Sequence, residues 1–247
     1  MAALIVNADD FGLAPGVNRG IRAARLHGIV RSTSVIVNLP QFAESVRELR
    51  AVPDIGIGLH LNLTQGTPVS AARDVPSLVD AQGMLQGDHD DIAARWTLDD
   101  VRRELGAQVE LFRSTGLPLG HLDSHKHIHR HLKVLEVVID LARSLHLPVR
   151  PLHRDRLDAA GIASPERYVD DVFFAPDGPD RLMERLLALS AGVSEFGCHP
   201  GYADDILRQR SVWVEERERE LRLFTADAIW TVVRDLRIDL VDYRVFA

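Results

Sequence analysis

Short apolar runs alternate with longer amphipathic segments along almost the whole of this 247-residue chain. The first run, residues 3–7, is continuously apolar and short, as the buried strands of parallel sheets are. The segments between the runs, such as 15–27 and 131–145, place apolar residues at helical spacing. This order predicts an α/β fold, either a barrel or a doubly wound sheet, in which helices join parallel strands.

The pattern predicts seven strands and six helices in one domain that spans residues 1–247, with no internal repeat or linker. Residues 64–96 interrupt the alternation, and an irregular segment of this length inside a domain is often a substrate lid. We predict strands at 3–7, 34–38, 55–63, 119–124, 148–152, 193–198 and 239–243, and helices at 15–27, 42–49, 97–114, 131–145, 181–190 and 213–235, the last one broken near Thr225.

Composition narrows the class of partner. The formal net charge of −7 disfavours nucleic acid or an anionic membrane surface as the main partner. We expect no membrane span, because no run approaches eighteen apolar residues, and the amino terminus lacks a secretory pattern, so we expect a cytoplasmic protein. The single cysteine, Cys198, excludes an internal disulfide and a zinc site with several thiolates.

Four stretches with metal-type ligands stand at or near the ends of predicted strands. They contain Asp9 and Asp10, His60, the His-rich segment 121–129, and His199. The carboxyl ends of parallel strands meet at one rim, where α/β barrels and open α/β sheets carry their active sites. Carboxylates and imidazoles gathered there are the parts of a hydrolytic metal centre.

Two of these stretches carry geometric information. Asp9 and Asp10 are neighbours, so both can face one site only if the strand already turns there, and Gly12 makes such a turn plausible. In the segment 121–129, His, Asp, His, His and His alternate with other residues, so an extended chain would line up one polar face. We favour metal or catalytic use of this face over a solvated edge strand, although the pattern does not separate His121 from His125.

Cys198 and His199 invite a thiol-nucleophile reading. Adjacent strand residues point to opposite faces, so the pair does not form a nucleophile–base dyad. Cys198 is better explained as a small buried residue. His199 ends its strand before a Pro-Gly turn, which places its ring at the mouth of that turn.

The chain resembles the YdjC-like carbohydrate deacetylases, the family that includes the chitooligosaccharide (diacetylchitobiose) deacetylase and the hopanoid-biosynthesis-associated homologues. The pieces occur in the family's order over nearly the full length, and their combination is more specific than any one of them. The segments that carry the resemblance are 6–12, 58–60 with 63–64, 121–125 with His127 and His129, 198–201 and the helix 216–221.

The resemblance implies a distorted (β/α) barrel of about seven parallel strands, often a homodimer, that removes N-acetyl groups from amino sugars. By the same resemblance, Asp10, His60 and His125 would hold one divalent ion. Asp9 would be the general base, and His199, protonated, would be the acid that serves the leaving amine. The expected substrate is an acetylated sugar or glycolipid.

The sequence does not decide between two kinds of metal ion, between two orienting residues, or between three functions. Magnesium is the family's usual ion, whereas two imidazoles favour zinc or another transition metal. Asp123 or Asn7 can orient a ligand histidine. One alternative function is a metal-dependent phosphoesterase or sugar-phosphate hydrolase, which needs basic residues near the lid, where Arg73 and Arg95 are the candidates. Another is a sugar-binding protein without catalysis, against which the complete residue set argues.

Overall fold

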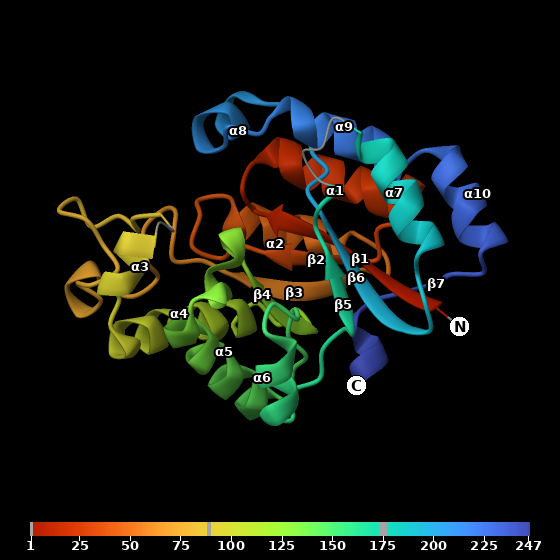
Figure 1. Ribbon diagram of the computed structural model, residues 1–247. Helices are drawn as coiled ribbons and strands as arrows, with labels where there is room; N and C mark the ends of the chain where they lie inside the picture. The colour runs from red at the N-terminus through yellow and green to blue at the C-terminus, as the bar shows by residue number, and fades with distance from the viewer. Residues whose placement is uncertain (1, 88–89, 173–176) are drawn as a thin grey trace.

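A fully parallel, seven-stranded sheet runs through the middle of the computed structural model, with helices above and below it in the view of Figure 1. The structure describes residues 2–87, 90–172 and 177–247, so residues 88–89 of the expected lid and 173–176 of the loop before α7 lie outside the described part. The strand order is β4-β3-β2-β1-β6-β5, and β7 also pairs with β1. The strands form a half-barrel in a single domain, which confirms the predicted distorted barrel.

The elements have the following bounds. The strands are β1 Ala2–Phe11, β2 Ser32–Val35, β3 Gly56–Leu61, β4 His121–Ser124, β5 Arg167–Val169, β6 Gly192–Cys198 and β7 Asp239–Val241. The α-helices are α1 Pro15–His27, α2 Phe42–Arg50, α3 Asp90–Arg95, α4 Leu98–Arg113, α5 Leu132–Leu145, α6 Arg154–Ala159, α7 Gly178–Leu187, α8 Asp205–Arg210, α9 Glu215–Phe224 and α10 Asp227–Asp235. Short 3-10 helices are η1 Ala72–Asp74, η2 His125–Arg130 and η3 Tyr243–Phe246.

β1 is the central strand of the sheet. β6 pairs with it from Ala2 to Ala8, and the opposite edge is shared by β7 over residues 3–5 and by β2 over residues 7–11. Leu4, Ile5 and Val6 have no exposed surface, because neighbouring strands and helices cover both faces. The amino-terminal half of β1 therefore belongs to the core, and its polar carboxyl end lies at the rim.

Register brings the polar strand ends of β3 and β4 together. His60 of β3 lies directly opposite Asp123 of β4, in a parallel pair. On the other side of β1, Ala8 lies opposite Cys198, the last residue of β6. Residues just beyond these pairs, Asp9 and His199, therefore emerge at the same edge of the sheet.

The strand predicted at 148–152 is wrong. Val149 forms one isolated bridge with Leu122, and the neighbouring Pro148 and Pro151 have no N–H to extend a ladder. The sheet instead gains β5, a strand of three residues that the pattern did not predict. A run this short gives no periodic signal.

The helix predictions agree better with the structure. α1 has the predicted bounds, and the predicted break near Thr225 separates α9 from α10. The short helices α3, α6 and α8 were not predicted, because six residues are fewer than two helical turns and carry little periodicity.

The expected lid, 64–96, is mostly irregular in its described residues and extends to one side of the sheet (Figure 1). Carboxylates of α4 hold it: Glu104 accepts the backbone N–H groups of Val69 and Ser70, and Asp100 accepts that of Ser77. A covering role for the segment stays a prediction.

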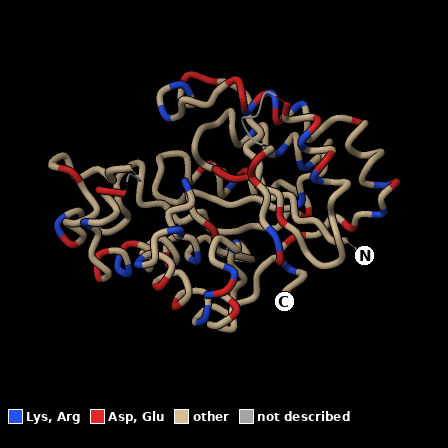
Figure 2. The backbone as a smooth tube through the Cα atoms, viewed as in Figure 1, with Lys and Arg blue, Asp and Glu red and all other residues tan. Residues whose placement is uncertain are grey.

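Charge on the tube drawing is mixed, with acidic and basic residues interspersed along the outer helices (Figure 2). Within the described residues, no helix combines the length and apolar character that crossing a bilayer requires. Neither observation changes the expectation of a small-molecule substrate.

Gly20 and Gly106 both lie inside helices, but Gly20 is closely packed and Gly106 faces open space. Replacing each of them by alanine tests how tightly α1 packs against the turn at residues 199–201. A Cβ on Gly20 of α1 would lie 2.4 Å from the Cα of Gly201, whereas a Cβ on Gly106 of α4 would meet nothing within 4 Å. We expect Gly20→Ala to lower the free energy of unfolding by about 1–3 kcal/mol through overpacking. Gly106→Ala, the matched control, should raise it by up to about 1 kcal/mol. Urea unfolding measures both, and equal effects would contradict the close contact.

Candidate metal centre and active site

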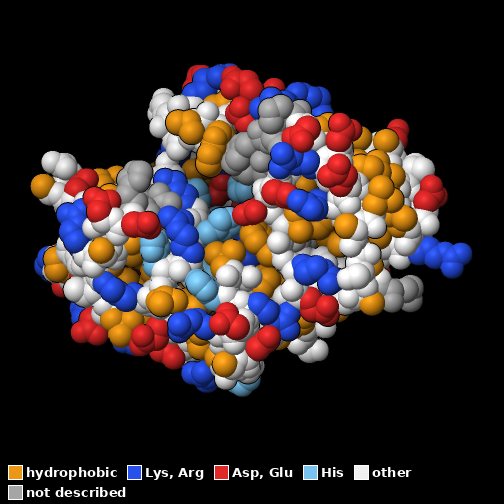
Figure 3. Space-filling view, in the orientation of Figure 1, with side chains coloured by type: hydrophobic (Ala, Val, Ile, Leu, Met, Phe, Trp, Pro, Cys, Tyr) orange, Lys and Arg blue, Asp and Glu red, His pale blue; other side chains and the backbone are white. Residues whose placement is uncertain are grey.

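A cavity of about 590 Å³ opens at the carboxyl ends of the strands. All five residues expected from the sequence to carry chemistry line it: Asp9, Asp10, His60, His125 and His199. Figure 3 shows histidine side chains gathered in the hollow at the centre of this face. The cavity has the size of a site for a small organic ligand.

The turn at the end of β1 is what brings the two aspartates together. Asp10 adopts a left-handed backbone conformation, with φ of 72°, and the register of β1 with β2 shifts between Ala8 and Phe11. Aspartate tolerates this conformation better than most residues. The strand therefore turns at Asp10, as expected if both carboxylates are to face one site.

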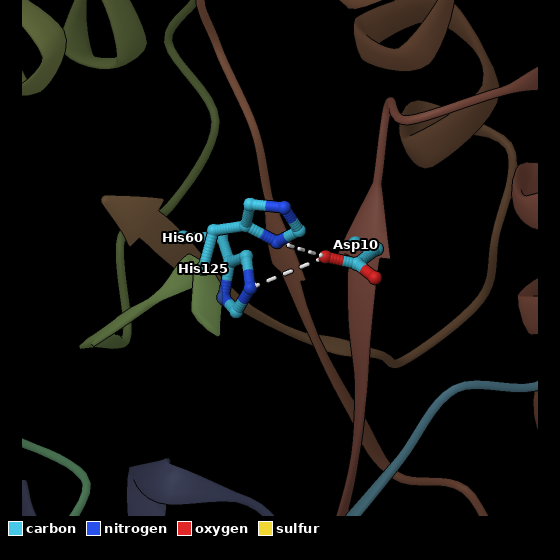
Figure 4. Close-up of side chains that lie close together, drawn as sticks. All are labelled: Asp10, His60 and His125. Atoms are coloured by element: carbon cyan, nitrogen blue, oxygen red, sulfur yellow. Dashed lines mark hydrogen bonds and ion pairs between the residues drawn. The ribbon is translucent and has the colours of Figure 1, made fainter. Parts of the chain in front are cut away.

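Asp10, His60 and His125 converge on a single point (Figure 4). One oxygen of Asp10, Oδ1, lies 2.8 Å from Nδ1 of His125 and 3.3 Å from Nε2 of His60. The three potential ligand atoms lie within 4.8 Å of one another, and all three residues are buried. One carboxylate and two imidazoles fit a divalent ion that keeps open positions for water or substrate.

Asp9, His60 and Asp123 form a second group of similar geometry. It fits an ion less well, because Arg150 contacts both oxygens of Asp9 and lies 3.1 Å from Asp123. The oxygen of Asp10 that faces the two histidines, Oδ1, is not the one that contacts an arginine. We therefore assign the metal-type site to the group that contains Asp10.

Asp123 orients His60. Its Oδ1 lies 2.8 Å from Nδ1 of His60, and its Oδ2 accepts a hydrogen bond from the Ser34 hydroxyl, so the Nε2 edge of the ring faces Asp10. Burial lowers the pKa of His60, but Asp123 and Asp10 outweigh burial and raise the pKa to about 10. Of the two orienting residues considered from the sequence, Asp123 has this role.

Asn7 serves the other aspartate. Its amide donates to Oδ1 of Asp9 at 2.8 Å and to Oδ2 of Asp123 at 3.5 Å. It thus contributes to the carboxylate positions rather than holding a histidine ring directly.

Arg150 fixes Asp9. Two of its nitrogens contact the two oxygens of Asp9 at 2.6 and 2.7 Å, and it also donates to Oε1 of Glu195 at 2.8 and 2.9 Å. The side chains of Arg150 and Glu195 have no exposed surface. Burial raises the pKa of Asp9, but the adjacent guanidinium outweighs burial and holds the pKa below its ordinary value. Asp9 is therefore an ionised carboxylate with a fixed direction.

Arg217 of α9 holds the second aspartate. It donates to Oδ2 of Asp10 at 2.6 Å, and its side chain is only 2 % exposed. Burial raises the pKa of Asp10, whereas His125 and Arg217 lower it, with the net result well below the ordinary value. The sequence analysis predicted the helix but did not identify Arg217 as a residue of the site.

His199 lies next to the base candidate. Its Nε2 is 3.8 Å from Oδ2 of Asp9, and its backbone N–H donates to the carboxylate of Glu220. Burial lowers the pKa of His199 to about 3, against the influence of Asp9 and Asp10. The ring is thus neutral in this arrangement, which differs from the protonated ring expected from the sequence.

Cys198 is buried, and burial raises the pKa of its thiol well above the ordinary value. This supports the sequence interpretation of Cys198 as a core residue. A thiolate nucleophile is not available at this position.

The alternating face predicted over 121–129 is wrong beyond Ser124. β4 ends there, and Lys126 and His127 take left-handed conformations within η2. His121 stacks on Tyr243 in the interior, with ring centroids 3.8 Å apart, and His129 contacts the Ser124 hydroxyl. Of the histidines in this stretch, His125 and His127 line the cavity.

Comparison with known proteins places this geometry in a family. The model of the family described as YdjC-like protein matches residues 3–235. The chain belongs to the YdjC-like family. Its relatives include a carbohydrate deacetylase of Thermoanaerobacter pseudethanolicus, 34% identical over 99% of both chains. Another is a carbohydrate deacetylase of Vibrio cholerae, 36% identical over 97% of this chain and 94% of the relative.

A solved structure is also similar to this one in three dimensions. The crystal structure of an Enterococcus faecalis V583 protein, named for cellobiose-phosphate cleavage, superposes with a TM-score of 0.93. The two chains are 31% identical, and the match covers 100% of this chain and 99% of the other. The whole half-barrel is therefore shared, including the regions around the metal-type site.

Replacement of Arg150 tests the buried ion cluster. Arg150→Met would leave Asp9 and Glu195 without their common cation, and breaking a buried pair from one side typically costs about 3–5 kcal/mol. We expect a loss of this size in the free energy of unfolding at pH 7, measured with urea. The matched control is Arg102→Met on the exposed side of α4, where the loss should stay below about 1 kcal/mol. Equal losses would show that the cluster does not stabilise the fold.

The raised pKa of His60 predicts proton release when a metal ion binds. An imidazole must lose its proton to become a ligand, and His60 with a pKa of about 10 is protonated at pH 7. Metal affinity should therefore rise about tenfold per pH unit from pH 7 towards pH 10. Calorimetric titration with Zn²⁺ or Mg²⁺, in buffers of different ionisation enthalpy, counts the protons released.

Asp123→Asn removes the main source of that raised pKa. The variant should release fewer protons. At pH 10 and above, where the proton of His60 barely competes with the ion in either protein, the variant should bind the ion about 10–100-fold more weakly. Tight binding without proton release in the unmodified protein would contradict a protonated His60.

Proposed function

We propose that the protein is a metal-dependent carbohydrate deacetylase, which hydrolyses the N-acetyl group of acetylated amino sugars or oligosaccharides. The observation that carries this proposal is the convergence of Asp10, His60 and His125 in one cavity with Asp9 and His199. The names of the curated YdjC-like relatives support the same reaction. An acetylated glycolipid is a further candidate substrate.

In this proposal Asp10, His60 and His125 hold one divalent ion. When bound, the ion supplies Lewis acidity for the acetyl carbonyl and acidity for a water molecule. Magnesium is expected from the family resemblance, whereas the two imidazole ligands favour zinc or another transition metal. Arg217 compensates the free oxygen of Asp10, which keeps that carboxylate ionised for coordination.

Asp9 and His199 then divide the proton transfers. Arg150 fixes Asp9 as an ionised carboxylate, and Asp9 takes the proton of the attacking water. His199 begins as a neutral ring 3.8 Å from Asp9, so it can receive this proton and pass it to the departing nitrogen. Only after that transfer is His199 the acid that the resemblance implies.

The phosphoesterase alternative is less well supported. It called for Arg73 and Arg95 near the substrate, and neither belongs to the described lining of the cavity. Arg73 lies beside Asp74, and Arg95 donates to Gln86. The arginines that do line the cavity are engaged: Arg217 with Asp10, and Arg210 with the carbonyl of Leu13.

A homodimer and a cytoplasmic location, both expected from the sequence, stay predictions. Light scattering of the purified protein and fractionation of cells test them directly. Neither is required for the proposed chemistry, because all five site residues come from one chain.

Acetate release tests the proposed function. Metal-loaded protein should release acetate from N-acetylglucosamine oligomers, and Asp9→Asn should lower kcat about 10²–10⁴-fold while metal content is kept. Asp10→Ala and His125→Ala should lose both metal and activity, because they remove ligands. Acetate assay and elemental analysis provide the two readouts.

The matched control is His27→Ala, which removes an exposed imidazole at the end of α1. It should keep both metal and activity. Retention of metal and activity in Asp10→Ala and His125→Ala would refute the ligand assignment.

A further inference from the structure

One wall of the cavity carries a polar pair that the proposed reaction does not use. His127 and Asp170 both line the cavity, and Nε2 of His127 lies 3.3 Å from Oδ2 of Asp170. The side chains are 28 % and 49 % exposed, unlike the buried ligands and base. A hydrogen bond of this length on an accessible pair leaves room for a further partner.

The fold holds this pair in place from below. The ring of His127 stands edge-on to Tyr168, with centroids 5.6 Å apart, and the guanidinium of Arg150 lies over the Tyr168 ring at 4.7 Å. Tyr168 therefore contacts both Arg150, which fixes Asp9, and His127. Lys126 and His127 keep left-handed backbones, which costs energy in residues other than glycine.

Most other polar side chains of the cavity are already committed. Arg217 contacts Asp10, Arg210 contacts Leu13, and the amide of Gln65 donates to the carbonyl of Arg210. The Asp170 carboxylate, by contrast, has several lone-pair sites on a half-exposed side chain. Carboxylates in such positions accept hydrogen bonds from vicinal hydroxyls, which an amino sugar has and a simple acetamide lacks.

We propose that Asp170 and His127 form a hydroxyl-recognition pair that positions the sugar ring while its acetamido group lies at the metal-type site. Asp170 accepts from ring hydroxyls, and His127 holds the carboxylate in place. These are positioning and specificity residues, not reacting groups. The inference rests on the proposed function for the identity of the sugar.

Asp170→Asn tests the pair, with Asp171→Asn as the matched control. The neighbouring Asp171 contacts Arg185 and, unlike Asp170, is not among the described residues that line the site cavity, so its change should leave sugar binding unaltered. For N,N′-diacetylchitobiose we expect Asp170→Asn to raise KM about 10- to 100-fold, with a smaller effect on kcat. Metal content and the urea midpoint should match those of the unmodified protein.

Binding of the products gives a second readout that does not depend on turnover. Calorimetry of metal-loaded protein should show chitobiosamine binding weakened at least about tenfold by Asp170→Asn and by His127→Ala, with acetate binding unchanged. Sugar binding within twofold of the unmodified protein in both variants, or an equal loss in Asp171→Asn, would overturn the inference. If the unmodified protein releases no acetate, the proposed function fails separately, because sugar binding still reports on the pair.

Discussion

The guanidinium of Arg150 is the interaction on which the site depends. It lies among three buried carboxylates, those of Asp9, Asp123 and Glu195. Without a cation, several ionised carboxylates buried close together would repel one another, and some would be protonated. With Arg150 present, Asp9 and Asp123 stay ionised, and each then serves a different neighbour. Asp123 orients His60, and Asp9 stays outside the Asp10, His60 and His125 group, which leaves it available as the proposed base.

A second buried arginine, Arg217, contacts the other aspartate of the pair. Arg217 compensates Asp10 in the same way that Arg150 compensates Asp9. The two adjacent aspartates have the same side chain, and they differ in their partners: Arg150 for Asp9 and Arg217 for Asp10. The proposed difference in their roles follows from these partners. The turn at Asp10 brings both side chains to one site, because a regular strand would send them to opposite faces of the sheet. Backbone strain at one residue thus gives the site its two distinct carboxylates.

The sequence predicted the grouping of Asp10, His60 and His125 better than the residues that support it, for a physical reason. Asp10, His60 and His125 stand near strand ends, and parallel strands bring their ends together whatever their exact register. Arg150 gave no such signal, because it lies within the wrongly predicted strand 148–152, between Pro148 and Pro151, and reaches the site by tertiary packing alone. Arg217 lies on a helix most of whose charged residues are not buried, so its inward direction could not be told from the pattern. The prediction of one polar face over residues 121–129 was wrong, because the alternation of residue types does not show that the strand ends at Ser124.

His60 and His125, the two proposed imidazole ligands, are held in different ways, and in the proposed function this difference would connect metal binding with substrate binding. His60 presents Nε2 from a strand, with its other nitrogen fixed by Asp123. His125 presents Nδ1 from the first residue of a turn whose next two residues have left-handed backbones. The same turn carries His127, which also lines the cavity. In the proposed function, any shift of this turn would move a metal ligand and a sugar contact together, whereas His60 would stay with the sheet. An ion bound by His125 would therefore also restrain His127, and metal binding would order the proposed sugar contact.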